Sequence, residues 1–351
     1  MTIVPRLAAQ DLEHVARRYA VAVSPTLLSL MDPADPRDPI ARQFLPSLAE
    51  LNTLPQEIAD PIGDGAHNPV PGIVHRHPGR VLFKAVAACP VYCRFCFRRE
   101  SIGPGKDNAL APAAFEAALA YIAAHPEIRE VILTGGDPFI LAPRRMAEIS
   151  GRLAAIPHVK IVRWHTRVPV TDPGRVTDEL VAALHGAGAT AWVAVHANHA
   201  REFGPDAARA IARLADGGIP LVSQSVLLKG VNDDVVSLAA LMRAFVEHRI
   251  KPYYLHHPDL APGTSHFRTA IAEGLALMAA LRRTLSGLEM PAYMLDIPGG
   301  FGKVPLESDH LEMSENGIRV RDMTGAWHDY PEPDAPALIA LDGRLKAGHG
   351  E

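Results

Sequence analysis

The feature that most constrains the fold is a regular alternation of apolar, β-rich runs with segments of helical periodicity. The β-rich runs begin near residues 81, 130, 160, 191, 220 and 252. Most successive runs are therefore about 30 residues apart, which is the length of a strand, a helix and their turns. This alternation implies a parallel sheet covered by helices. The units share no sequence motif, which argues against a solenoid.

The number of units limits the choice of architecture. A further strand-like run, Pro291–Asp296, follows the sixth unit. We therefore predict an α/β fold, a parallel (β/α)6-type partial TIM barrel, with a doubly wound open sheet as the alternative. Residues 1–70 are expected to form a helical N-terminal cap or lid, residues 71–306 the core, and residues 307–351 a short C-terminal extension.

Composition excludes several classes of protein. The chain is 48% hydrophobic and 21% charged, with a net charge of −4, which argues against a broad nucleic-acid surface. No apolar run reaches the roughly 18 residues that a membrane span needs. The N-terminus lacks the basic and apolar regions of a secretory signal. We therefore expect a cytoplasmic protein without nucleic-acid or membrane partners.

The chain has three cysteines, Cys89, Cys93 and Cys96, with the spacing C-x3-C-x2-C directly after the first predicted strand. In parallel α/β folds, this carboxyl edge of the sheet carries the chemistry. Three thiolates can bind three irons of a [4Fe–4S] cluster, which usually takes four cysteines. The fourth iron would then be open to the amino and carboxylate groups of S-adenosylmethionine (SAM). Three structural cysteines, or a zinc site completed by histidine, are the alternatives.

A glycine-rich strand end lies one βα unit after the cysteines. Gly135, Gly136 and Asp137 end the second predicted strand, and glycines there let the backbone approach a ligand closely. By itself the run is an ordinary Gly-Asp-Pro turn. In this position we predict that it contacts SAM. His196 and Gln224, at later strand ends, are weaker candidates for the same region, and a buried structural role is the alternative.

A second glycine-rich run, DIPGGFGK from Asp296 to Lys303, lies near the end of the predicted core. It is not a phosphate-binding P-loop, because Val304 follows the lysine where that motif requires Ser or Thr. The alternative is a lysine that forms a Schiff base with pyridoxal 5′-phosphate (PLP).

With these motifs, the sequence resembles the lysine 2,3-aminomutase family of radical SAM enzymes from about residue 75 to residue 306. Further matching runs are His75–Arg80, Cys96–Arg99, Thr166–Arg167, His196–His199, Gln224–Asp233, Tyr254–Asp259 and Gly263–Thr269. The resemblance implies an isomerase that interconverts L-lysine and L-β-lysine by a 1,2-amino shift. A 5′-deoxyadenosyl radical made from SAM would remove hydrogen, and a PLP aldimine would carry the migrating nitrogen. An external electron donor of the flavodoxin or ferredoxin type is implied, and a homo-oligomer is compatible with the family.

The resemblance also assigns roles to residues. Lys303 would hold PLP, and Arg76, His77 and Arg80 would lie around that cofactor. Arg98 would bind the substrate carboxylate, which suits the planar, bidentate guanidinium.

Two acids complete the expected substrate site. Asp259 and Asp296 follow successive predicted strands and would bind the distal ammonium of lysine, although each alone could be an ordinary turn residue.

The sequence departs from the family in three respects. His77 stands where the family has a tyrosine against the pyridine ring, and Phe95 where free-lysine enzymes commonly have histidine. The tail lacks the cysteines that longer members use for a structural metal.

Two other functions stay open. One is the short branch of the family that makes β-lysine for elongation factor P, which length and the missing tail cysteines favour. The Asp296–Lys303 loop favours the free-lysine branch instead. The other is a non-catalytic iron–sulfur or zinc protein, against which Lys303 argues.

Overall fold

The computed structural model describes residues 9–103, 109–306, 311–314, 317–321 and 326–330. Its internal contacts divide the chain into two units, Met1–Leu306 and Glu307–Glu351, and each is described by itself. The first unit is built on a nine-stranded sheet, and the second contains a three-stranded sheet.

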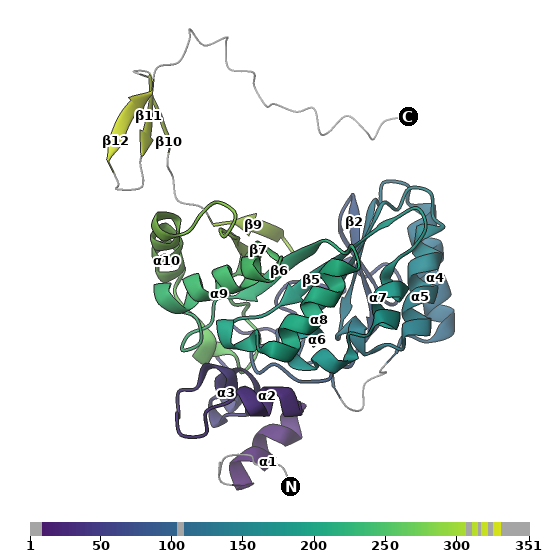
Figure 1. Ribbon diagram of the computed structural model, residues 1–351, viewed down its shortest axis with the longest axis horizontal. Helices are drawn as coiled ribbons and strands as arrows, with labels where there is room; N and C mark the ends of the chain where they lie inside the picture. Colours follow the sequence, from purple (N-terminus) through teal and green to yellow (C-terminus); the bar gives the residue numbers. More distant parts are fainter. Residues whose placement is uncertain (1–8, 104–108, 307–310, 315–316, 322–325, 331–351) are drawn as a thin grey trace. The chain divides into compact units, whose positions relative to one another are not determined.

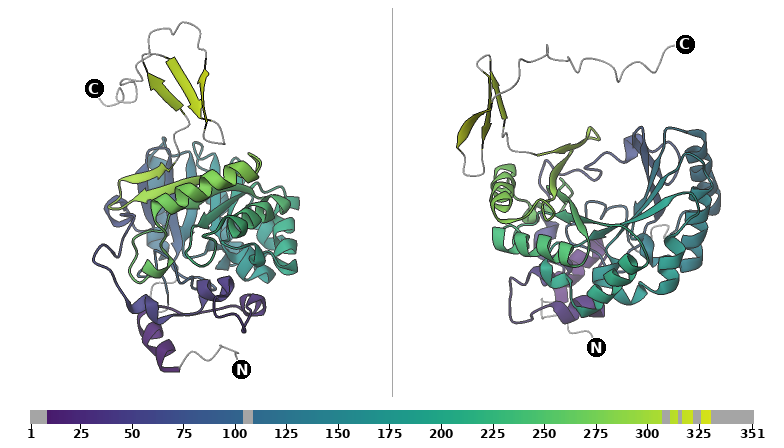
Figure 2. Two further views of the ribbon diagram at one scale, coloured as in Figure 1. Left: turned by 90° about the vertical axis from the view of Figure 1, so that its left-hand side faces the viewer. Right: turned by 45° about the horizontal axis from the view of Figure 1, so that its top comes forward.

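Parallel strands form the centre of the large sheet (Figure 1). They are β2 (Arg80–Val86), β3 (Glu130–Gly135), β4 (Ile161–Thr166), β5 (Thr190–His196), β6 (Leu221–Val226), β7 (Lys251–His256) and β8 (Ala292–Ile297). Each pairs in parallel with the next in chain order. Figure 2 shows the sheet curving, with helices on its outer side. The predicted partial barrel is therefore confirmed.

Two antiparallel strands extend the sheet at its ends, and the sequence analysis expected neither. Strand β1 (Ile73–His77) pairs with β2, and β9 (Gly302–Pro305) pairs with β8. Within the described residues the sheet order runs from β1 to β9 without a pairing that joins its two ends. Both added strands carry residues of the predicted site.

Helices connect the parallel strands. They are α4 (Pro112–Ala124), α5 (Pro143–Ala154), α6 (Val168–Thr171), α7 (Asp178–Leu184), α8 (Pro205–Asp216), α9 (Val235–Glu247) and α10 (Ile271–Thr284). Several begin with proline, whose missing N–H costs no bond in the first helical turn. Helix α9 is instead capped by Asp234, whose carboxylate accepts the backbone N–H groups of Val236 and Ser237.

Short 3₁₀ helices lie in loops that follow the strands: η3 (Pro138–Ile140), η4 (Pro173–Arg175), η5 (Ala200–Glu202) and η6 (Ser265–Phe267). One hydrophobic core fills the space between the sheet and its helices. Strand β6 is buried along nearly its whole length, as expected for a parallel strand covered on both sides.

The N-terminal segment is tied to the core by buried ion pairs. It contains α1 (Ala9–Arg18), α2 (Pro25–Leu30), α3 (Pro39–Phe44), η1 (Leu48–Leu51) and η2 (Gly65–His67). Glu50, in η1, has no exposed area and accepts hydrogen bonds from Arg94 and Arg99. Both arginines belong to the loop that carries the cysteines, so the segment packs against that loop.

The second unit contains β10 (Leu311–Ser314), β11 (Gly317–Arg321) and β12 (Trp327–Tyr330), paired antiparallel in chain order. In the described part of the chain, no helix has the length and apolar composition needed to cross a bilayer.

The Glu50 ion pairs lead to a prediction about stability. Glu50→Ala should lower the free energy of unfolding by about 3–5 kcal/mol, because two buried guanidinium groups lose their carboxylate partner. Urea denaturation followed by circular dichroism measures the change. Glu116→Ala, which removes an exposed partner of Arg152, is the matched control and should leave the midpoint unchanged. A Glu50→Ala midpoint equal to that of the control would show that these ion pairs do not hold the fold.

Candidate active site

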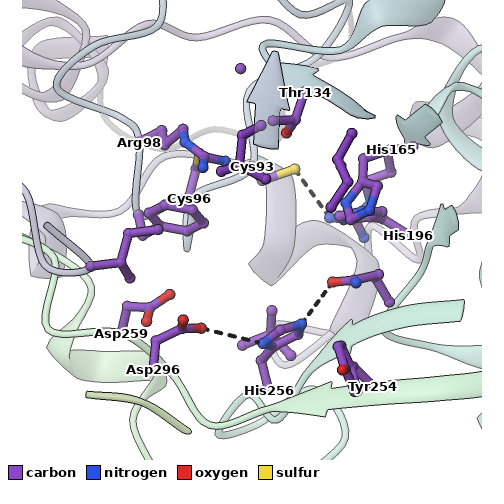
Figure 3. Close-up of a pocket in the computed structure, with 18 of the residues that line it drawn as sticks. Cys93, Cys96, Arg98, Thr134, His165, His196, Tyr254, His256, Asp259 and Asp296 are labelled. Carbon is purple, nitrogen blue, oxygen red and sulfur yellow. Dashed lines mark hydrogen bonds and ion pairs between the residues drawn. The ribbon is translucent and has the colours of Figure 1, made fainter. Parts of the chain in front are cut away.

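The predicted site residues line a single cavity of about 310 Å³ inside the curved sheet (Figure 3). They come from strand ends, from the loops after the strands, and from the two added edge strands. They are Arg76, His77, Arg80, Cys89, Cys93, Cys96, Arg98, Gly135, Gly136, Asp137, His196, Gln224, Asp259, Asp296 and Lys303. Parallel strands bring their carboxyl ends to one edge, and this geometry collects residues that are far apart in the sequence.

The three cysteines lie on the loop between β2 and α4 and are partly buried. Burial and the neighbouring Cys93 raise the pKa of the Cys96 thiol to about 11. Burial, Asp137 and the other two thiols also raise the pKa of Cys89. The thiols therefore lie within one another's electric field. Binding to iron requires thiolates, so loading of a cluster here would release protons.

Arg167 connects the cysteine loop to the barrel. Its Nη1 donates to Cys93 Sγ at 3.1 Å, and its Nη2 donates to Glu202 Oε2 at 2.7 Å. Its backbone N–H donates to the Asp137 carboxylate at 2.7 Å. The positive charge of Arg167 therefore lies in direct contact with the sulfur of Cys93.

The glycine-rich end of β3 packs directly on the backbone that leads to Cys89. Gly136 N–H donates to Val86 O at 2.7 Å, and a Cβ on Gly136 would lie 2.1 Å from Ala88 O. Gly135 has a φ of +105°, which favours glycine. The Asp137 carboxylate accepts hydrogen bonds from the Thr166 hydroxyl group and from the backbone N–H groups of Phe139 and Arg167. It therefore links the ends of β3 and β4.

Strands β8 and β9 place Asp296 and Lys303 together. The two residues are directly paired across the antiparallel ladder, so their side chains project from the same face. Lys303 Nζ donates to Asp296 Oδ2 and lies 3.0 Å from His256 Nδ1. Burial works against ionisation of Asp296, but His256 and Lys303 outweigh it and hold its pKa below the usual value.

His256, the last residue of β7, lies between two parts of the cavity. Its Nε2 donates to Gln224 Oε1 at 2.7 Å, and its Nδ1 faces Lys303. Burial and the charge of Lys303 lower the pKa of His256 to about 4. The imidazole is therefore neutral near pH 7.

Asp259 and Asp296 lie side by side on one wall of the cavity, and Arg98 lies across from them (Figure 3). Burial raises the pKa of Asp259 to about 7, and the negative charge of Asp296 contributes to the rise. A cation placed between the two carboxylates would relieve this repulsion.

Arg98 is held by a carboxylate that the sequence analysis did not single out. Its Nε and Nη2 donate to Asp64 Oδ2 at 3.2 and 3.1 Å. Arg76 donates to the other oxygen of Asp64 at 3.3 Å, and Lys84 Nζ lies 3.9 Å away. Asp64 thus provides one negative charge for three basic side chains.

The remaining predicted cofactor residues come from the hairpin of β1 and β2. His77 and Arg80 pair across this hairpin, and Arg76 Nη1 lies 3.8 Å from Asp296 Oδ1. Burial lowers the pKa of His77, and Arg80 and Arg76 lower it further. A neutral imidazole therefore stands near Lys303, beside Gly302.

Sequence reasoning missed the roles of Asp64 and His256. Asp64 lies in a Pro-, Gly- and Asp-rich loop, where acids are ordinary turn residues and give no signal. His256 did carry a signal, because it is a polar residue at the carboxyl end of a parallel strand.

Known proteins with similar sequences are radical SAM aminomutases. The profile of the radical SAM superfamily matches residues 85–242. L-lysine 2,3-aminomutase of Clostridium subterminale is 38% identical over 331 residues, covering 93% of this chain and 79% of that protein. Glutamate 2,3-aminomutase of Clostridioides difficile (strain 630) is 37% identical, with 93% and 78% covered. L-lysine 2,3-aminomutase of Escherichia coli (strain K12) is 35% identical, with 82% and 84% covered.

The cavity fits the cofactors that the superfamily implies, a [4Fe–4S] cluster and SAM. Among the described residues, no three His, Cys, Asp or Glu side chains form a site for one metal ion. A cluster differs from a single ion, because each thiolate binds its own iron. The buried Nε2 atoms of His165 and His196 have no hydrogen-bond partner within the described residues. They would offer partners to a polar ligand such as SAM.

The cysteine loop generates a prediction about metal content. Anaerobic reconstitution of the wild type should give about four irons per chain, and Cys89→Ala, Cys93→Ala or Cys96→Ala should each abolish reductive cleavage of SAM. Iron analysis and release of 5′-deoxyadenosine measure the two effects. Ser101→Ala, an exposed change on the same loop, is the control. Full SAM cleavage by any one cysteine variant would overturn the ligand assignment.

Proposed function

The chain belongs to the lysine 2,3-aminomutase family of radical SAM enzymes, and from this membership we propose that it interconverts L-lysine and L-β-lysine. The observation that carries the choice of lysine is the pair of carboxylates, Asp259 and Asp296, on one wall of the cavity. Relatives named for lysine and a relative named for glutamate match this chain almost equally well. The choice between the two substrates therefore rests on the side chains of the site.

When bound, the cluster with SAM supplies a radical that can remove an unactivated hydrogen atom, and PLP supplies the group to which the migrating nitrogen bonds. In this proposal Cys89, Cys93 and Cys96 hold the cluster, and Lys303 holds PLP. Arg76 and Arg80 provide positive charge for an anionic phosphate. An external one-electron donor of the flavodoxin or ferredoxin type completes the reductive step.

The charges along the cavity match an amino acid with a distal ammonium group. Asp259 and Asp296 would bind the ammonium, and its positive charge would offset the repulsion that raises the pKa of Asp259. A substrate carboxylate at this wall would instead add a third negative charge. The wall therefore supports lysine over glutamate.

Arg98, across the cavity from the acid pair, would bind the α-carboxylate. In the structure its donors are directed to Asp64, which also bonds Arg76. A substrate carboxylate would compete with Asp64 for the same guanidinium edge. This exchange keeps the charge on Arg98 balanced both before and after substrate binds.

The acid pair gives a test of substrate identity. Asp259→Asn removes one partner of a buried charge pair, which typically costs about 2–5 kcal/mol. Lysine kcat/KM should fall roughly 30- to 4,000-fold, at about 1.4 kcal/mol per tenfold. Asp259 is a cleaner probe than Asp296, because Asp296 also bonds Lys303. Turnover of L-lysine and L-glutamate by anaerobically reconstituted enzyme, with chiral product analysis, measures the effect.

The exposed change Asp206→Asn serves as the control for this assay. Wild-type turnover of lysine to β-lysine is the expected result. Turnover of glutamate in preference to lysine, or lysine turnover by Asp259→Asn within threefold of the wild type, would refute the assignment of the acid pair.

The raised pKa of Asp259 predicts a pH dependence. Below a pKa of about 7 the carboxyl group is protonated and loses its attraction for an ammonium group, whereas Asp296 stays ionised because its pKa is lowered. The KM for lysine should therefore rise by up to about tenfold as the pH falls from 8 to 6. Asp259→Asn should abolish this rise. Initial rates at saturating SAM and PLP give the profile, and a flat wild-type KM would contradict the prediction.

A further inference from the structure

We propose that His256 is the proton acceptor for Lys303, taking a proton from Nζ onto Nδ1 so that the lysine becomes a free amine able to bond to a carbonyl carbon. This inference rests on the proposed function, in which Lys303 is the residue that holds PLP. It adds a catalytic residue that acts on the nitrogen of Lys303 itself.

The hydrogen bonds of His256 fix the state of its ring. Nε2 faces Gln224 Oε1 at 2.7 Å, and an amide oxygen can only accept, so Nε2 carries the hydrogen. Nδ1 then has a free lone pair, which faces Lys303 Nζ at 3.0 Å. In the neutral imidazole, both contacts are satisfied when Nδ1 accepts from the Lys303 ammonium, and after proton transfer Nδ1–H donates back to the free amine.

The proton transfer is balanced within the chain. The N–H bond of the Lys303 ammonium breaks and the Nδ1–H bond of His256 forms, with no change in oxidation state. The positive charge moves from Nζ to the imidazole. It stays beside the same carboxylate, because Asp296 Oδ2 lies 3.7 Å from Nδ1. The return of the proton regenerates the ammonium when Lys303 is released.

The other groups near Lys303 are poorer acceptors. Asp296 contacts the amine, but His256 and Lys303 hold its pKa below the usual value despite its burial. The pKa of His256, about 4, is higher, so His256 is the stronger base of the two and takes the proton in an uphill, reversible step. Tyr254 presents its ring to Nζ, 5.8 Å from the centroid, while its hydroxyl group accepts a bond from Tyr253. His256 is left as the neutral base in contact with the amine.

The experiment measures the reactivity of Lys303 in protein free of PLP. Trace reductive methylation with formaldehyde and cyanoborohydride uses a carbonyl probe small enough for the cavity. Peptide mass spectrometry then gives the labelling of Lys303 relative to exposed Lys229. His256→Gly should lower this ratio at least about tenfold, since a positioned base typically contributes 10²–10⁴-fold. Free imidazole should restore the ratio in the glycine variant in a concentration-dependent manner.

Two further variants separate chemistry from packing. His256→Gln fills a similar volume and can accept a hydrogen bond but cannot take a proton, so its ratio should stay low with or without imidazole. His257→Ala changes the neighbouring histidine, which bonds Tyr293 and does not line the cavity. Its ratio should equal that of the wild type. A wild-type ratio in His256→Gln, or a glycine variant that imidazole does not rescue, would overturn the proposal.

A parallel arm tests the premise. Wild-type protein is incubated with PLP and reduced with borohydride, and the modified lysine is identified by peptide mapping. PLP on Lys303 with no effect of His256 on methylation would refute the role of His256 and leave the proposed function intact. PLP on another lysine, together with a rescued glycine variant, would refute the proposed function and leave the proton transfer standing.

Discussion

The buried carboxylate of Glu50 ties the cysteine loop to the N-terminal segment. Its negative charge forms ion pairs with Arg94, which directly follows Cys93, and with Arg99, which lies three residues after Cys96. Arg94 also donates to Ala20 O, and Arg99 donates to Gly263 O. The cysteine loop is therefore bonded to the N-terminal segment and to the loop after β7 at the same time. The cysteine loop is not part of a strand. These charged contacts therefore fix the positions of its three cysteines.

The parallel sheet explains why the remaining residues meet. Each strand from β2 to β8 ends at the same edge, so one cavity collects residues from widely separated parts of the chain. The antiparallel strands at the two ends of the sheet add residues that the parallel strands do not supply. Strand β1 brings Arg76, and β9 brings Lys303, from positions that a repeated strand–helix pattern does not supply. In the proposed function, the barrel provides the residues for the cluster and SAM, and its edge strands provide Arg76 and Lys303 for PLP.

The sequence predicted the parallel core well, because apolar strands and helices about 30 residues apart leave few alternatives. It did not predict β1 and β9, which are short edge strands without a long apolar run. The cysteines and the glycine-rich runs were found by their type and spacing, whereas the arginines of the site were predicted from the family resemblance. The structure brings both sets to one cavity. Their partners were harder to foresee. Asp64 and His256 act through contacts with residues 12 to 47 positions away, and no local pattern encodes such contacts.

The length of the turn in the β8–β9 hairpin determines which way Lys303 points. Ile297 pairs with Gly302, and Asp296 pairs with Lys303, across a four-residue connection that contains two glycines with positive φ. Side chains alternate along a strand, so a shift of one position turns every side chain to the opposite face. Insertion or deletion of one residue in this turn would point the lysine away from the cavity while its neighbours stayed folded. Evolution can therefore vary an exposed position of this turn such as Phe301, provided that the residue count and the two positive-φ glycines are kept.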